Sequence, residues 1–81
     1  MKAWVARDRN GSLWIFTCKP IKDLRIDAWV LRNSPSLLNK VHEELFEPGY
    51  FDSVKWEDKE PTECDYWPNP VDDMQYITLK K

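Results

Sequence analysis

The sequence predicts an α+β fold: an antiparallel sheet of four to six strands with an N-terminal β-hairpin and one short helix packed on it. Three observations lead to this prediction. They are a hairpin signal at the amino terminus, one stretch with apolar residues at helical spacing, and a closing run of strand-forming residues at 74–80. With 81 residues and no internal repeat, the chain is expected to form a single small domain, residues 1–81.

The first two strands are predicted at residues 2–7 and 12–18. Both runs are rich in Trp, Val, Ile and Phe, and the turn sequence Asp-Arg-Asn-Gly lies between them. Both runs are also largely apolar on both faces, unlike a strand with one side in water. The hairpin is therefore expected at the centre of the sheet, covered on at least one side.

The turn sequence allows two registers for this hairpin. A two-residue Asn-Gly turn would pair Val5 with Phe16, whereas a type I turn followed by a left-handed Gly11 would pair Trp4 with Phe16. We favour the second register because it places Asp8 at the first position of the turn and aligns two aromatic residues across the strands.

The remaining elements follow from local patterns. Further strands are predicted at 25–32, 50–56 and 62–67, before the closing strand at 74–80. A helix is expected to begin at Ser34-Pro35 and to end before Pro48-Gly49, with an apolar face formed by Leu37, Leu38, Val41 and Leu45. Three glutamates in its last turn oppose the helix dipole, so we expect a short helix that is frayed or partly 3₁₀.

Charge is distributed unevenly along the chain. Residues 1–42 contain eight Lys or Arg and three Asp, a net +5, whereas residues 43–81 contain four Lys and eleven acids, a net −7. In one small domain these halves are expected to neutralise each other across neighbouring strands; two oppositely charged faces are the alternative. No signal peptide or membrane-spanning run is found, so a cytoplasmic location without membrane contact is expected.

No pattern in the sequence points to catalysis. The stretch VKWEDKEPTE, residues 54–63, lacks the alternating ligands and the glycine of a calcium loop, and is expected to form a solvated acidic turn held by a buried Trp56. Cys18 and Cys64 lack zinc-site spacing and are expected to be core residues. We therefore expect no metal, no cofactor and no enzymatic activity.

Single-stranded nucleic-acid binding is the alternative function that the sequence leaves open. Basic residues surround the aromatic residues of the first hairpin, and such surfaces hold single strands; the basic ones are Lys2, Arg7, Arg9, Lys19 and Lys22. However, nucleic-acid-binding domains are usually basic overall, and this chain has a pI near 5.3. Nucleic acid is accordingly the less favoured partner.

Three passages, MKAWVARDRNGSLWIF, KPIK and VKWEDKEPTE, resemble a family of small bacterial proteins of gut Bacteroidetes type. That family has a similar Trp-containing hairpin and a Val-x-Trp-Glu-x-x-Pro-x-Glu segment near its carboxyl end. The resemblance covers about half of the chain and departs after Glu63, where residues 64–73 form an insertion. It implies a bacterial cytoplasmic or mobile-element accessory protein, and brings no activity, cofactor or catalytic residue.

The leading hypothesis is a noncatalytic domain that binds another protein. Trp and Tyr are the usual anchors of such interfaces, and those at the ends of predicted strands are least needed by a core. The candidate partner-binding residues are Trp67, Tyr66 and Tyr50, with Asp65, Asp72 and Asp73 as an acidic rim for a basic partner. The sequence equally allows Trp67 to fold back over the sheet edge and complete the core.

Overall fold

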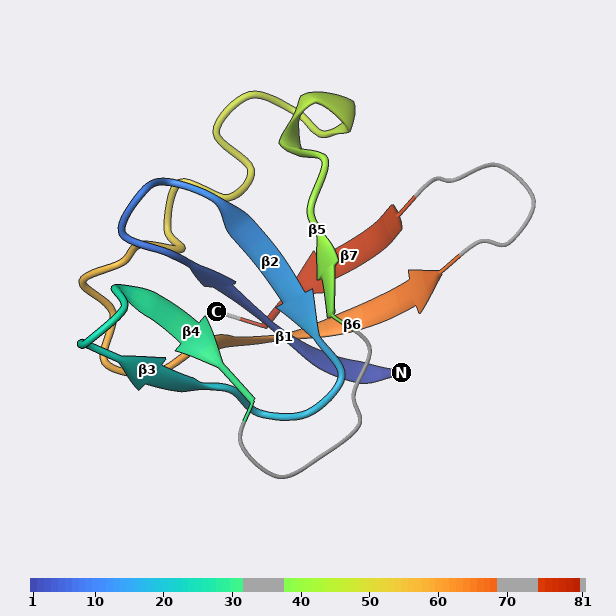
Figure 1. Cartoon of the computed structure of the whole chain (residues 1–81). Coiled ribbons are helices and arrows are strands. Elements are labelled where there is room, and N and C mark those ends of the chain that lie inside the picture. Colours follow the sequence, from blue (N-terminus) through green and yellow to red (C-terminus); the bar gives the residue numbers. More distant parts are fainter. Residues whose placement is uncertain (32–37, 69–74, 81) are drawn as a thin grey trace.

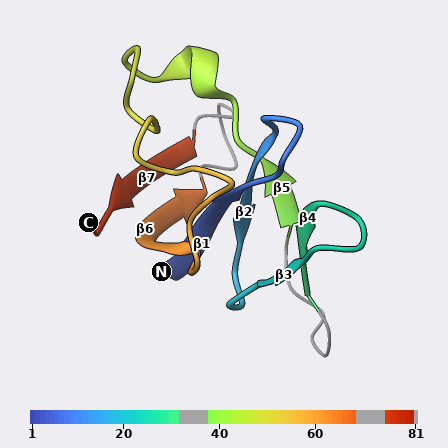
Figure 2. The ribbon, with the colours of Figure 1, turned by 90° about the vertical axis from the view of Figure 1, so that its left-hand side faces the viewer.

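The protein consists of a five-stranded antiparallel sheet and a separate two-stranded hairpin, as described by a computed structural model for residues 1–31, 38–68 and 75–80 (Figure 1). The order of the strands in the large sheet is β5-β2-β1-β6-β7, and Figure 2 shows them side by side in this order. Its strands are β1 (Lys2–Arg7), β2 (Leu13–Phe16), β5 (Leu38–Lys40), β6 (Thr62–Pro68) and β7 (Gln75–Leu79). The small hairpin is formed by β3 (Ile21–Asp23) and β4 (Ala28–Val30).

The N-terminal hairpin has the register that we favoured. Trp4 lies opposite Phe16, and Gly11 has a φ of +95°. The turn closes through two backbone hydrogen bonds: the Gly11 N–H donates to the Asp8 carbonyl at 3.0 Å, and the Asp8 N–H donates to Ser12 at 2.8 Å. The turn chemistry therefore fixed the pairing, and β1 lies at the centre of the sheet, as expected.

The predicted helix, and with it the α+β class, is not found in the described residues. Residues 38–40 form β5 instead, which pairs with β2, and the only helical element of the described ranges is a 3₁₀ turn, η1 (Glu43–Leu45). The start predicted at Ser34-Pro35 lies outside the described residues. The prediction was wrong because an unpaired edge of β2 needs hydrogen-bond partners, and the N–H of Val41 continues the ladder to the Leu13 carbonyl at 2.9 Å.

One predicted strand was wrong, and another is shorter than predicted. Residues 50–53 form consecutive turns, and only Phe51 and Val54 of the predicted strand 50–56 are buried, three residues apart. A strand would have required a spacing of two. The strand predicted at 25–32 is shortened to β4, because residues 24–27 form a turn in which Asp27 has a φ of +55°. The strands expected at 62–67 and 74–80 correspond to β6 and β7.

Each face of the large sheet carries its own apolar cluster. On one face, side chains from β1, β2, β6 and β7 pack under the segment 41–54, and the buried members include Val5, Ile15, Phe51, Val54 and Cys64. On the other face, Ala6 and Phe16 pack against Trp29 of β4, with Trp14, Leu31 and Trp56 at the margin. The small hairpin therefore covers the second face only near β1 and β2.

Candidate interaction surface

No segment within residues 1–31, 38–68 and 75–80 covers the second face of the sheet over β6, β7 and the first half of β1. Strand pairing places Trp4 opposite Glu63, Lys2 opposite Asp65, and Trp67 opposite Tyr76. Directly opposed residues, and every second residue along each strand, point to the same side of the sheet. We call this surface the aromatic face; it is formed by Lys2, Trp4, Glu63, Asp65, Trp67, Tyr76, Thr78 and Lys80.

Trp67 and Tyr76 are the main apolar groups that this surface presents to solvent. Trp67 is 63% exposed and Tyr76 is 48% exposed. Their Cβ atoms should lie about 5 Å apart, as in any directly opposed pair. The structure thus decides between the two placements that the sequence allowed for Trp67: the ring is on the surface and is not folded into the core.

The charged residues of the aromatic face neutralise each other. Lys2 Nζ lies 3.1 Å from Glu63 Oε1, and Lys80 Nζ lies 3.6 Å from Glu63 Oε2 and 3.5 Å from Asp65 Oδ1. The hydrogen bond from Lys2 lowers the pKa of Glu63, and the charge of Asp65 raises the pKa of Lys80. Two cations and two anions in one network leave this surface without net charge.

Two of the other predicted binding residues, Tyr66 and Tyr50, do not lie on the aromatic face. Tyr66 is only 3% exposed and belongs to the core, so its expected exposure was wrong. It neighbours Trp67 in β6, and adjacent strand residues point to opposite faces. Tyr50 lies on the other side of the sheet, where its ring contacts Phe46 and Phe51 and its hydroxyl donates to the Ile77 carbonyl at 2.6 Å.

Asp65 is the one predicted rim residue whose position is described; Asp72 and Asp73 lie outside the described residues. Tyr76 was missed as a candidate. The alternation of side chains along the closing strand could have indicated it. Tyr76 alternates with the buried Ile77 and lies on the same side as Thr78 and Lys80, both polar. The pairing of Tyr76 with Trp67 required the tertiary register.

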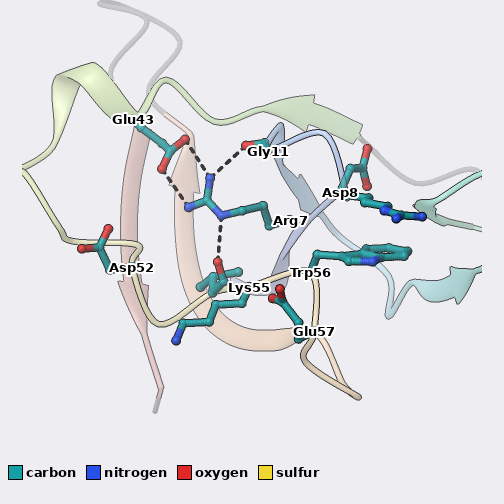
Figure 3. A pocket seen from close by; sticks show the side chains of 10 residues that line it. Arg7, Asp8, Gly11, Glu43, Asp52, Lys55, Trp56 and Glu57 are labelled. Carbon is teal, nitrogen blue, oxygen red and sulfur yellow. Dashed lines mark hydrogen bonds and ion pairs between the residues drawn. The ribbon is translucent and has the colours of Figure 1, made fainter.

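The Arg7 side chain lines an open cavity of about 350 Å³ at the end of the sheet, which Figure 3 shows from close by. Its guanidinium makes a double contact with Glu43 of η1, at 2.9 and 3.1 Å. It also donates to the carbonyls of Gly11, Val54 and Phe51. All five N–H donors of the group are therefore used, and Arg7 acts as an internal clamp rather than a ligand-binding cation.

The basic residues that suggested nucleic-acid binding are engaged within the protein. Phe16, one of the aromatic residues they surround in the sequence, is buried under the small hairpin. Three of the basic residues pair with acids of the C-terminal half, which agrees with the expected neutralisation of the two halves; the pairs are Lys2–Glu63, Arg7–Glu43 and Lys19–Glu60. Of the other two, Arg9 contacts Asp27, and Lys22 donates to the Trp56 carbonyl.

The acidic stretch 54–63 forms a turn that leads into β6. The Lys55 N–H donates to Asp58 Oδ2 at 3.1 Å, and Trp56 is half-buried against the second apolar cluster. No group of three or more potential metal ligands gathers in the ranges that the structure describes. Within the same ranges, no helix has the length and hydropathy needed to cross a membrane.

The two cysteines differ in their surroundings. The Cys64 side chain of β6 is fully buried in the first apolar cluster, whereas Cys18 is half-buried, and neither forms a disulfide. Burial raises the pKa of the Cys64 thiol to about 11. A thiol is reactive as the thiolate, so Cys64 is a structural residue.

Comparisons with known proteins place this chain in no family: no family model matches it, and neither the curated proteins nor the solved structures yield a significant match. The resemblance of the three passages to small bacterial proteins therefore stays a prediction.

Proposed function

We propose that this protein is a noncatalytic domain that binds another protein through its aromatic face. The observation that carries the proposal is the pair of exposed, directly opposed rings of Trp67 and Tyr76. Aromatic side chains on a rigid sheet lose little conformational entropy on binding and are the commonest energetic anchors of interfaces. Nucleic-acid binding is the weaker candidate, because the basic residues of the hairpin are already paired within the protein.

The test compares the proteins captured by the immobilised wild-type domain with those captured by the double variant Trp67→Ala/Tyr76→Ala. A matched control removes two other exposed apolar side chains, Leu24 and Ile26 at the turn of the small hairpin, as Leu24→Ala/Ile26→Ala. We expect a partner that is retained by wild type and control but lost from the aromatic variant. Equal capture by all three proteins, or no capture above background, would contradict the proposal.

A further inference from the structure

We propose that the ligand of the aromatic face is an extended, uncharged, proline-rich segment of the partner protein; this inference rests on the proposed function. The first observation behind it is the size of the ring surface. An aromatic side chain has roughly 150–250 Å² of surface to bury. The exposed fractions of Trp67 and Tyr76 leave roughly 200 Å² of ring, which is enough to contact a few residues of an extended peptide.

The second observation is the electrostatic balance of the surface. Glu63 contacts both lysines, and Lys80 contacts both carboxylates, so each charge has a partner before any ligand arrives. A charged ligand would have to compete with these ion pairs and would meet no net opposite charge. An uncharged segment gains the ring contacts without breaking the network.

The third observation concerns the edge of the sheet at β7, where a partner strand would otherwise pair. The Lys80 N–H donates to the Glu63 carbonyl at 3.0 Å, so by alternation the backbone groups of Ile77 point away from β6. The Tyr50 hydroxyl already donates to the Ile77 carbonyl, and the Tyr50 ring is held there by Phe46 and Phe51. Strand addition is therefore blocked at the middle of β7, so a ligand on this side of the sheet contacts the rings of the aromatic face rather than the strand edge.

A polyproline II segment meets these three conditions together. It has no internal hydrogen bonds, needs no ladder with a neighbouring strand, and docks on exposed aromatic rings that contact its prolines. Its carbonyls are free to accept from the Trp67 indole N–H and the Tyr76 hydroxyl. Neither donor is used within the described part of the chain. Since the segment is already extended and stiff, binding costs little additional ordering.

The experiment titrates the full chain with a blocked hexaproline peptide and follows backbone amide shifts by NMR. We expect saturable shifts at residues of β6 and β7, and a dissociation constant at least about thirtyfold weaker for Trp67→Ala. Trp67→Phe retains a ring and loses the indole donor, so it should fall between wild type and Trp67→Ala. Leu24→Ala serves as the matched control and should bind as wild type does.

Two further ligands distinguish the sources of binding. A Gly-Ser peptide of equal length should leave the spectrum unchanged, and a soluble cello-oligosaccharide should do the same. Equal binding of either ligand, or no response to hexaproline, would overturn the inference. If hexaproline fails while partner capture still depends on Trp67 and Tyr76, only the peptide class is wrong; if both fail, the proposed function falls as well.

Discussion

The same face of one sheet has two halves with different fates. Over β1 and β2, the small hairpin places Trp29 on Ala6 and Phe16, and the ring is 6% exposed. Over β6 and β7, no described segment covers Trp67 and Tyr76, and both rings face solvent. The comparison shows that aromatic content alone does not distinguish core from surface. Which rings are buried depends on how much of the face is covered by the ten-residue hairpin, residues 21–30.

The covered half is held by polar contacts as well as by packing. The Trp29 indole N–H donates to the Arg7 carbonyl at 3.0 Å, and the Trp29 backbone N–H donates to Asp8 Oδ1 at 2.9 Å. The Lys22 ammonium lies over the Trp29 and Trp56 rings, 5.2 and 4.4 Å from their centres. These contacts fix the small hairpin on one half of the face.

The largest expected effect is the difference in stability between two truncations, one of a ring in the covered half of the face and one of a ring in the uncovered half. Trp29→Ala should destabilise the protein by about 3 to 5 kcal/mol, because it empties a packed site and leaves the Arg7 carbonyl without its donor. Trp67→Ala should change the free energy of unfolding by less than about 0.5 kcal/mol. Urea unfolding followed by circular dichroism measures both.

Trp29→Phe provides a milder test in case Trp29→Ala fails to fold. It keeps most of the ring volume and removes the indole N–H, so an intermediate loss is expected. A loss for Trp67→Ala as large as that for Trp29→Ala would show that the two halves are equally packed, and would remove Trp67 from the binding surface.

The second prediction concerns the clamp on the opposite face. Arg7→Lys should destabilise by about 2 kcal/mol, because an ammonium cannot reproduce the fork to Glu43 together with the carbonyl contacts. The matched control is Arg9→Lys, which alters an exposed pair with Asp27 at 3.3 Å and should change stability by less than about 0.5 kcal/mol. Equal losses in the two variants would mean that the Arg7 contacts contribute nothing beyond a surface ion pair.

The smallest effect is a titration on the uncovered half. Because the hydrogen bond from Lys2 lowers the pKa of Glu63, the carboxyl should titrate below its ordinary value, as measured by carbon-13 NMR. The ionised form is favoured in the folded protein, so its contribution to stability is present above the unfolded pKa and is lost as the pH falls through the folded pKa. Lys2→Gln should raise the pKa of Glu63 towards normal, though Lys80 remains.

Lys55→Gln is the control for that titration, since Lys55 lines the Arg7 cavity and has no contact with Glu63. It should leave the Glu63 midpoint unchanged. An equal shift in both variants would indicate a general effect of net charge and would remove the Lys2–Glu63 pair from the description of the aromatic face.

The elements that the sequence predicted well are those in which local chemistry and the tertiary fold agree. Asp8 and Gly11 define a turn whose geometry sets the register of β1 and β2, and the hydrogen bond from the Trp29 N–H to Asp8 adds a distant contact to the same turn. The last two strands, β6 and β7, were likewise readable from runs of β-branched and aromatic residues. The alternation in the closing strand also indicated that Tyr76 faces outward, but it did not indicate that Tyr76 pairs with Trp67.

The tertiary structure decided what the local signals left ambiguous. Helical spacing was present in the apolar residues Leu37, Leu38, Val41 and Leu45. However, residues 38–40 pair with β2, whose open edge a helix would have left without backbone partners. Phe51 and Val54 were drawn into the core from turns rather than from a strand. Whether Trp67 lay inside or outside depended on how far the small hairpin reached across the sheet. That reach is set by contacts between segments distant in sequence, such as Trp29 with Arg7, and no local pattern encodes it.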